Sequence, residues 1–216
     1  ANYEPHWAFT RVEKPKVPTI EWGTTEIDRF VAAKIKSKGL EPNSEASSFE
    51  LIKRASLDLT GLPPSLELLE KYAGFKGANT YDKLLDQLLS SPAYGEKMAI
   101  LWLDISRYSD SYGYQDDNIR SQWPYRDWVI HAFNKNLPYD QFLTWQLAGD
   151  LLPNPTKEQI LATAFNRNHK YTEEGGIIEE EYRVEYVLDK TNTFSKGILG
   201  ITMECAQCHD HKYDPV

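Results

Sequence analysis

The sequence predicts an all-α fold, in which a single multi-helix domain over residues 24–216 follows an extended N-terminal arm over residues 1–23. Apolar residues recur at helical spacing through most of the domain, and capping residues or prolines separate these stretches at short intervals. Nowhere does an alternation of apolar and polar residues persist long enough to indicate a β-strand. The arm is rich in proline and lacks a helical period, so it is predicted to stay extended.

Helices in the first half of the domain are marked by capping residues. Their expected starts, in chain order, are Thr24 or Thr25, Ser47, Ser65 and Thr80. Ser47 forms a capping-box pattern with Glu50, which predicts a well-defined helix start. Gly39 and Gly61 are expected to end the first two helices, because glycine readily adopts the left-handed conformation that closes a helix.

Prolines open several predicted helices of the second half, because the first helical position needs no N–H donor. The expected starts are Pro92, Pro124 and Pro138, followed by a helix capped at Thr156 that runs through Asn166, and a long helix over 177–196. The Pro92 helix is expected to carry Met98, Trp102 and Tyr108 at core spacing. Polar loops are expected over 109–123 and 167–176.

Composition narrows the class of protein. The net charge of −8 disfavours binding to nucleic acid, since a phosphate backbone needs a basic stripe and none is visible. No run of about 18 apolar residues exists, so no membrane span is predicted in this chain.

The tail contains Cys-Ala-Gln-Cys-His over 205–209, which includes the only two cysteines of the chain. This spacing is the attachment pattern of haem c, in which each thiol adds to one vinyl group of the same porphyrin. The following imidazole can then take the fifth position on iron. We therefore expect a covalent haem c on Cys205 and Cys208, with His209 as the proximal iron ligand.

Two other interpretations of the motif remain open at this stage. Cys205, Cys208, His209 and His211 offer the two sulfurs and two imidazoles of a zinc site, although only one residue separates the histidines. The two cysteines could also act as a thiol redox pair or form a disulfide.

Several further residues are candidates for contacts with the haem. The sixth iron ligand is unknown, and the residues that could supply it are His6, Met98, His131 and His169. Arginines that could pair with the propionates, because a guanidinium matches a carboxylate, are Arg107, Arg126 and Arg183. The second nitrogen of His209 is expected to donate to a backbone carbonyl, with the carboxylates of Asp210 and Asp214 as alternatives.

Long stretches of the chain resemble the planctomycete-type cytochrome-c-associated domain, a domain of unknown function. The matching stretches include IDRFVAAKIKSKGLEP at 27–42, DLTGLPPS at 58–65, YRDWVIHAFNKNLPYDQFLTWQLAGDLLP at 125–153 and CAQCHDHKYDP at 205–215. Such domains are parts of large exported bacterial proteins, and the Cys-x-x-Cys-His motif belongs to the family pattern. The resemblance thus implies haem on the same three residues and implies no settled activity.

The expected function is electron transfer by a haem c domain of a larger exported, periplasmic redox protein, with neighbouring domains or separate redox proteins as partners. One rival is a haem enzyme with an open sixth iron site that acts on a small molecule or a glycan-related substrate. Its pocket would be lined by Asp104, Arg107, Tyr108 and Asp110. The other rival is a structural module in which the motif serves zinc or thiol chemistry.

Overall fold

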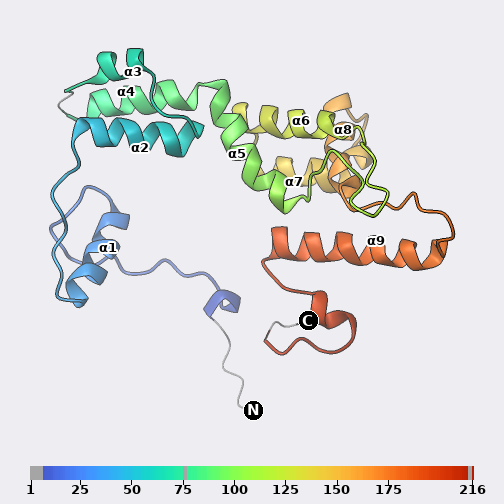
Figure 1. Cartoon of the computed structure of the whole chain (residues 1–216). Coiled ribbons are helices and arrows are strands. Elements are labelled where there is room, and N and C mark those ends of the chain that lie inside the picture. The colour runs from blue at the N-terminus through green and yellow to red at the C-terminus, as the bar shows by residue number, and fades with distance from the viewer. Residues whose placement is uncertain (1–6, 75–76, 214–215) are drawn as a thin grey trace. The chain divides into compact units, whose positions relative to one another are not determined.

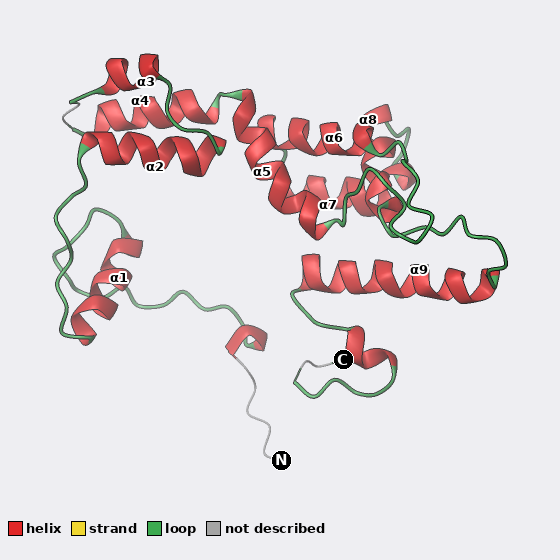
Figure 2. Ribbon diagram, viewed as in Figure 1, coloured by secondary structure: helices red, strands yellow, loops and turns green. Residues whose placement is uncertain are grey.

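The computed structural model describes residues 7–74, 77–213 and 216. Within these residues the regular secondary structure is helical, apart from one isolated bridge between Ser111 and Ile119. The all-α prediction is confirmed (Figure 2). None of the helices in this part of the chain combines the length and the apolar character that crossing a bilayer requires.

The chain divides into two compact units, Ala1–Ala46 and Ser47–Val216. The smaller unit contains the 3₁₀ turn Trp7–Phe9 and helix α1 (Glu26–Ser37). Thr25 caps α1 in a reciprocal capping box with Asp28, which decides between the two threonines considered as caps. The predicted boundary at residue 24 therefore lies inside this unit, and α1 groups with the arm that precedes it.

One helical layer of the larger unit is formed by α2 (Ser48–Thr60), α3 (Leu66–Tyr72) and α4 (Ala78–Leu89) (Figure 1). The predicted capping box of Ser47 and Glu50 is present, and Gly61 ends α2 in the left-handed conformation. The prediction that Thr80 caps the fourth helix is wrong, because α4 begins after Gly77. The buried apolar residues of this layer are Ile52, Ala55, Leu68, Tyr72, Leu84 and Leu88.

A second core lies among α5 (Pro92–Ile105), α6 (Trp123–Asn134), α7 (Tyr139–Ala148) and α8 (Lys157–Ala162). Trp102 of α5 and Trp128 of α6 both pack against Phe142 of α7, with ring centroids 4.9 and 5.4 Å away. Tyr108 lies beyond the end of α5, so its predicted place on that helix is wrong. The α8 helix also ends earlier than predicted, and 3₁₀ turn η3 (Thr163–Arg167) continues it.

The last long helix is α9 (Glu179–Phe194), which a π-helical turn extends over Ser195–Leu199. Gly200, in the left-handed conformation, ends this turn. The chain then forms the short 3₁₀ turn η5 (Glu204–Gln207), which holds the first cysteine of the motif. The tail with the Cys-x-x-Cys-His motif thus follows directly from the end of α9 (Figure 1).

Candidate functional site

The cysteine–histidine motif lies on a tight turn at the surface. The carbonyl oxygen of Cys205 accepts hydrogen bonds from the backbone N–H groups of Cys208 and His209, at 3.3 and 3.4 Å. Both thiols are free and exposed. Lys196 on the π-helical turn pairs with Glu204 at 2.5 Å, and this ion pair connects the turn that carries Cys205 to the end of α9.

The two histidines of the tail have different hydrogen-bond partners. His209 Nδ1 lies 2.8 Å from the carbonyl oxygen of Asp210. A carbonyl only accepts, so Nδ1 carries a proton, and in the neutral ring Nε2 is then the nitrogen with the lone pair. The expected backbone-carbonyl partner of His209 is therefore confirmed, whereas Asp214 lies outside the described residues.

His211 uses both of its ring nitrogens within the protein. Its Nδ1 accepts from the backbone N–H of Tyr213 at 3.1 Å, which places the proton on Nε2. Nε2 then donates to the hydroxyl oxygen of Thr202 at 3.2 Å. A metal ligand needs a free lone pair, so His211 is committed to the fold of the tail as it stands. Within the described residues, no three histidine, cysteine, aspartate or glutamate side chains are grouped so that they could hold a metal ion.

Arg107 lies near the tail in an unusual conformation. It follows α5 with φ of +59°, a left-handed backbone angle that is rare for residues other than glycine. Its Nη1 pairs with the carboxylate of Asp189 on α9. Its Nε and Nη2 are buried and have no hydrogen-bond partner among the residues that the structure describes. Burial lowers the pKa of Arg107, and the nearby Asp189 carboxylate acts in the opposite direction.

A cavity of about 460 Å³ lies beside Arg107. It is lined by the end of α5, by α9 with its π-helical turn, and by Glu204, the residue directly before the first cysteine. Of the four residues proposed for an enzyme pocket, Asp104 and Arg107 line this cavity. Tyr108 instead donates a hydrogen bond of 2.6 Å to Asp110.

The other arginines and histidines singled out from the sequence have partners elsewhere in the larger unit. Arg126 pairs with the adjacent Asp127 at 2.8 Å, and Arg183 pairs with Glu180 on α9 at 2.6 Å. His131 lies 3.7 Å from the carboxylate of Glu158.

The remaining candidates for the sixth ligand are His169, Met98 and His6. His169 stacks on Tyr186, with ring centroids 4.6 Å apart. Met98 is half-buried on α5. His6 lies outside the described residues.

Taken together, the fold and the tail define an all-helical protein that presents a free Cys-x-x-Cys-His motif on a surface turn. Residues 26–216 match the family model PSCyt2, described as a protein of unknown function (DUF1549), and the chain belongs to this family. The predicted family membership is confirmed. No curated protein and no solved structure matches the chain.

Proposed function

We propose that the chain binds haem c covalently through Cys205 and Cys208, with His209 as the proximal iron ligand, and that it serves as an electron-transfer domain of a larger exported redox protein. The observation that carries the proposal is the difference between the two tail histidines. His209 donates through Nδ1 to a carbonyl and leaves Nε2 available, whereas both nitrogens of His211 have partners. The histidine at the position that haem attachment requires is the one ready to bind iron.

The motif residues fit the group. Covalent attachment requires two reduced thiols that a porphyrin can approach, and both cysteines are free and exposed. The hydrogen bond from Nδ1 to the Asp210 carbonyl orients the imidazole and raises its basicity as a ligand. When bound, the haem would supply an iron centre that accepts and donates single electrons.

Arg107 is suited to a carboxylate of such a group. Its buried Nε and Nη2 lack partners, and an unpaired buried donor costs about 1–3 kcal/mol. A carboxylate that accepted from both nitrogens would remove this cost. All three arginines already pair with a carboxylate, but Arg107 keeps two buried donors without a partner beside its ion pair with Asp189, so we assign Arg107 to a propionate.

The decisive experiment expresses the chain with an export signal and the haem c maturation machinery. The expected product gains the mass of one haem, keeps it under denaturing conditions, and gives the pyridine haemochrome spectrum of two thioether bonds. Cys205→Ala and Cys208→Ala should each lose covalent haem or shift that spectrum toward a single thioether. His209→Ala should lose the native axial ligation, whereas the control His211→Ala should keep its spectrum.

Two outcomes would overturn the proposal. Protein that is exported and folded but carries no tetrapyrrole mass would exclude haem, and stoichiometric zinc in the same sample would support a zinc module instead. If haem is bound, carbon monoxide distinguishes an electron-transfer domain from a haem enzyme with an open sixth iron site. It binds reduced iron only where the sixth position is open. A spectrum that carbon monoxide leaves unchanged supports electron transfer, and a changed spectrum supports the enzyme.

A further inference from the structure

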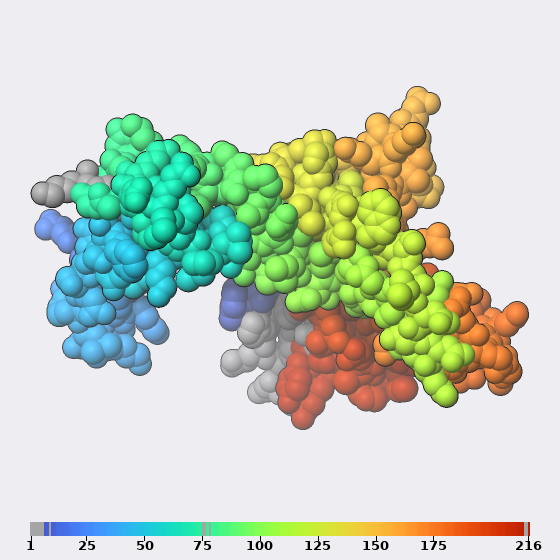
Figure 3. All heavy atoms as spheres, turned by 45° about the horizontal axis from the view of Figure 1, so that its top comes forward, coloured from blue at the N-terminus to red at the C-terminus, as the bar shows by residue number. Residues whose placement is uncertain are grey.

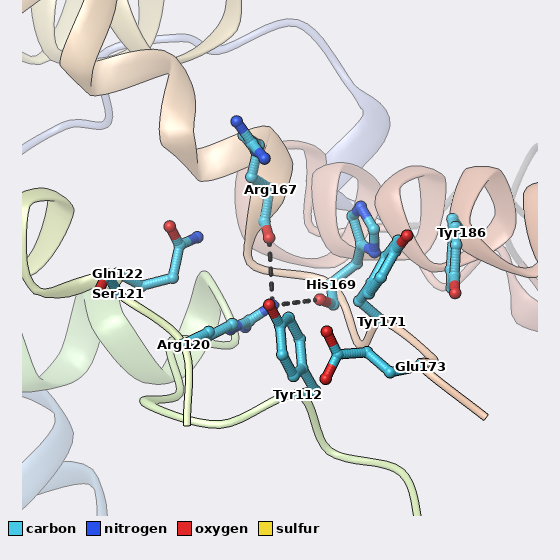
Figure 4. Close-up of a pocket in the computed structure, with 9 residues that line it drawn as sticks. All are labelled: Tyr112, Arg120, Ser121, Gln122, Arg167, His169, Tyr171, Glu173 and Tyr186. Carbon is cyan, nitrogen blue, oxygen red and sulfur yellow. Dashed lines mark hydrogen bonds between the residues drawn. The ribbon is translucent and has the colours of Figure 1, made fainter. Parts of the chain in front are cut away.

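Two polar loops and helix α9 enclose a second cavity, of about 600 Å³ (Figure 4). The loops are the two that the sequence predicts, and residues more than forty positions apart meet there. Gln115 N–H donates to Glu174 at 3.0 Å, and Asn118 Nδ2 donates to Glu173 at 3.1 Å. The first of these loops also lies beside the start of α9 in the space-filling view (Figure 3).

Arg120 holds the two loops together through backbone carbonyls, and within the described part of the chain no ion pair joins its guanidinium to a carboxylate. Its guanidinium donates to four backbone carbonyl oxygens at 2.8 to 3.4 Å, those of Ser109, Arg167, Asn168 and His169. Because these carbonyls are neutral, the positive charge of Arg120 is not paired by them. The cavity therefore has a wall that is fixed by hydrogen bonds and that is cationic.

Aromatic rings form another part of the lining. Tyr171 lies against Tyr112 and Tyr186, with ring centroids 5.6 and 5.7 Å apart. His169 stacks on Tyr186 at 4.6 Å. A flat heterocycle inserted between two rings needs about 7 Å between their faces, twice the usual carbon–carbon contact distance. These rings already pack on one another, so they offer an outer apolar surface and no slot for an intercalated base or flavin.

The polar groups around this surface include both donors and acceptors. Arg120 and Arg167 only donate, the carboxylate of Glu173 only accepts, and the amide of Gln122 does both. Figure 4 shows Arg120 and Glu173 beside Tyr112 and Tyr171, whereas the side chain of Arg167 extends away from these rings and its carbonyl oxygen faces Arg120. A ligand that fits must present an apolar face to the tyrosines and, at its edge, several groups that donate and accept at once. The ring of a sugar has this character, since its C–H groups form an apolar face and its hydroxyls lie at the rim.

We propose that this cavity is a carbohydrate-binding site, in which a sugar ring packs on the tyrosine surface and its hydroxyls bond to Arg120, Gln122 and Glu173. The site is separate from the cysteine–histidine motif and does not depend on haem. Burial lowers the pKa of His169, so its ring is largely neutral at pH 7 and can accept a hydroxyl hydrogen bond.

The test is titration calorimetry of the chain with soluble oligosaccharides. The neutral ones are oligomers of glucose, xylose and N-acetylglucosamine, and the acidic ones are oligomers of galacturonate. Adenosine and riboflavin represent the competing class of ligand, flat aromatic heterocycles. At least one oligosaccharide should bind. Tyr171→Ala should weaken that binding about tenfold, the loss that corresponds to about 1.4 kcal/mol. Glu173→Gln should weaken it less, because an amide still accepts one hydrogen bond. The control Tyr139→Ala removes an exposed tyrosine on α7 and should leave the affinity unchanged.

Absence of binding to every oligosaccharide at millimolar concentration would overturn the proposal, as would binding that Tyr171→Ala does not weaken or a preference for adenosine or riboflavin. Tyr171 is 46% exposed, so its truncation should preserve the fold, and circular dichroism of each variant checks this. The titration is repeated on protein with and without covalent haem. Equal affinities would separate this site from the proposed haem function.

Discussion

At the scale of single residues, the larger core is organised around a buried glutamine. Gln146 Oε1 accepts hydrogen bonds from Trp102 Nε1 and Tyr125 Oη, both at 2.7 Å. Gln146 Nε2 donates to the carbonyl oxygen of Phe142 at 2.9 Å. Because both the oxygen and the nitrogen of the amide have partners, these hydrogen bonds offset the cost of placing Gln146 in an apolar core.

Gln146→Leu should lower the free energy of unfolding by about 2 kcal/mol, because the buried Tyr125 hydroxyl loses its acceptor, whereas Trp102 Nε1 keeps its 3.1 Å bond to Tyr125 Oη. Urea denaturation followed by tryptophan fluorescence measures this loss. Gln141→Leu, an exposed position on the same helix, is the control and should change the stability little. Equal effects at the two positions would show that the buried network contributes nothing.

Tyr108 provides a prediction about pH. Burial, followed by its hydrogen bond to Asp110, raises the pKa of Tyr108 to about 12. The folded state therefore keeps a proton that the unfolded chain loses near pH 10. The contribution of Tyr108 to stability is complete below pH 10 and is lost as the pH rises toward 12.

Denaturation between pH 9 and pH 12 should show a steeper loss of stability for the natural chain than for Tyr108→Phe. Asp110→Asn should move the phenol absorbance titration of Tyr108 back toward pH 10, because a neutral amide no longer favours the protonated phenol. Parallel stability curves for the natural chain and Tyr108→Phe would contradict the assignment.

At the scale of elements, helices α5 and α6 approach closely at a glycine. The N–H of Gly95 donates to Asn134 Oδ1 at 2.9 Å. A Cβ atom at this position would overlap the side chain of Asn134 and the carbonyl oxygen of Ile130, a backbone atom that cannot swing aside. The crossing of these two helices therefore depends on the absence of a side chain at residue 95.

Gly95→Ala should destabilise the chain by about 2 kcal/mol, since relief of the overlap must separate two packed helices. Gly175→Ala is the matched control, because it has open space around it and a backbone angle that alanine tolerates. Thermal unfolding followed by circular dichroism compares the two. An unchanged melting temperature for Gly95→Ala would show that α5 and α6 do not approach as described.

At the scale of the whole molecule, the division into two units places the connection between them around residue 46. The segment between α1, which ends at Ser37, and α2, which begins at Ser48, has no regular secondary structure beyond a turn. Glu45 in this segment is exposed. Exposed connections between compact units are the preferred sites of proteolysis.

Brief digestion with a glutamate-specific protease should cut after Glu45 and release a fragment that begins at Ala46. The other glutamate of this segment, Glu41, precedes Pro42, which protects the bond between them. The fragment should remain helical by circular dichroism, because both described cores lie within residues 47–216. Intact mass spectrometry identifies the first cut. A first cut within residues 47–216, for example after Glu173, would contradict the division of the chain into two compact units.

The sequence by itself determined the helical class, the positions of most helices and the family. These features depend on residues a few positions apart: Ser47 and Glu50 form their capping box, and Gly61 closes its helix, whatever lies elsewhere in the chain. The Cys-x-x-Cys-His pattern is readable for the same reason, because its five residues are consecutive. The start of α4 at Ala78 was missed, since its N-cap is Gly77, which has no side chain to form a recognisable capping hydrogen bond.

The tertiary structure alone decided which residues surround each candidate site. The pairing of Arg107 with Asp189 joins positions 82 residues apart, and the cavity of Tyr112, Tyr171 and Tyr186 draws one ring from each of three segments. No local pattern encodes such neighbours, because they follow from how packed helices place their connecting loops. The state of His211 was likewise decided in the fold, since its Nε2 bonds to Thr202, nine positions earlier in the chain, whereas the partner of His209 is the carbonyl of the next residue.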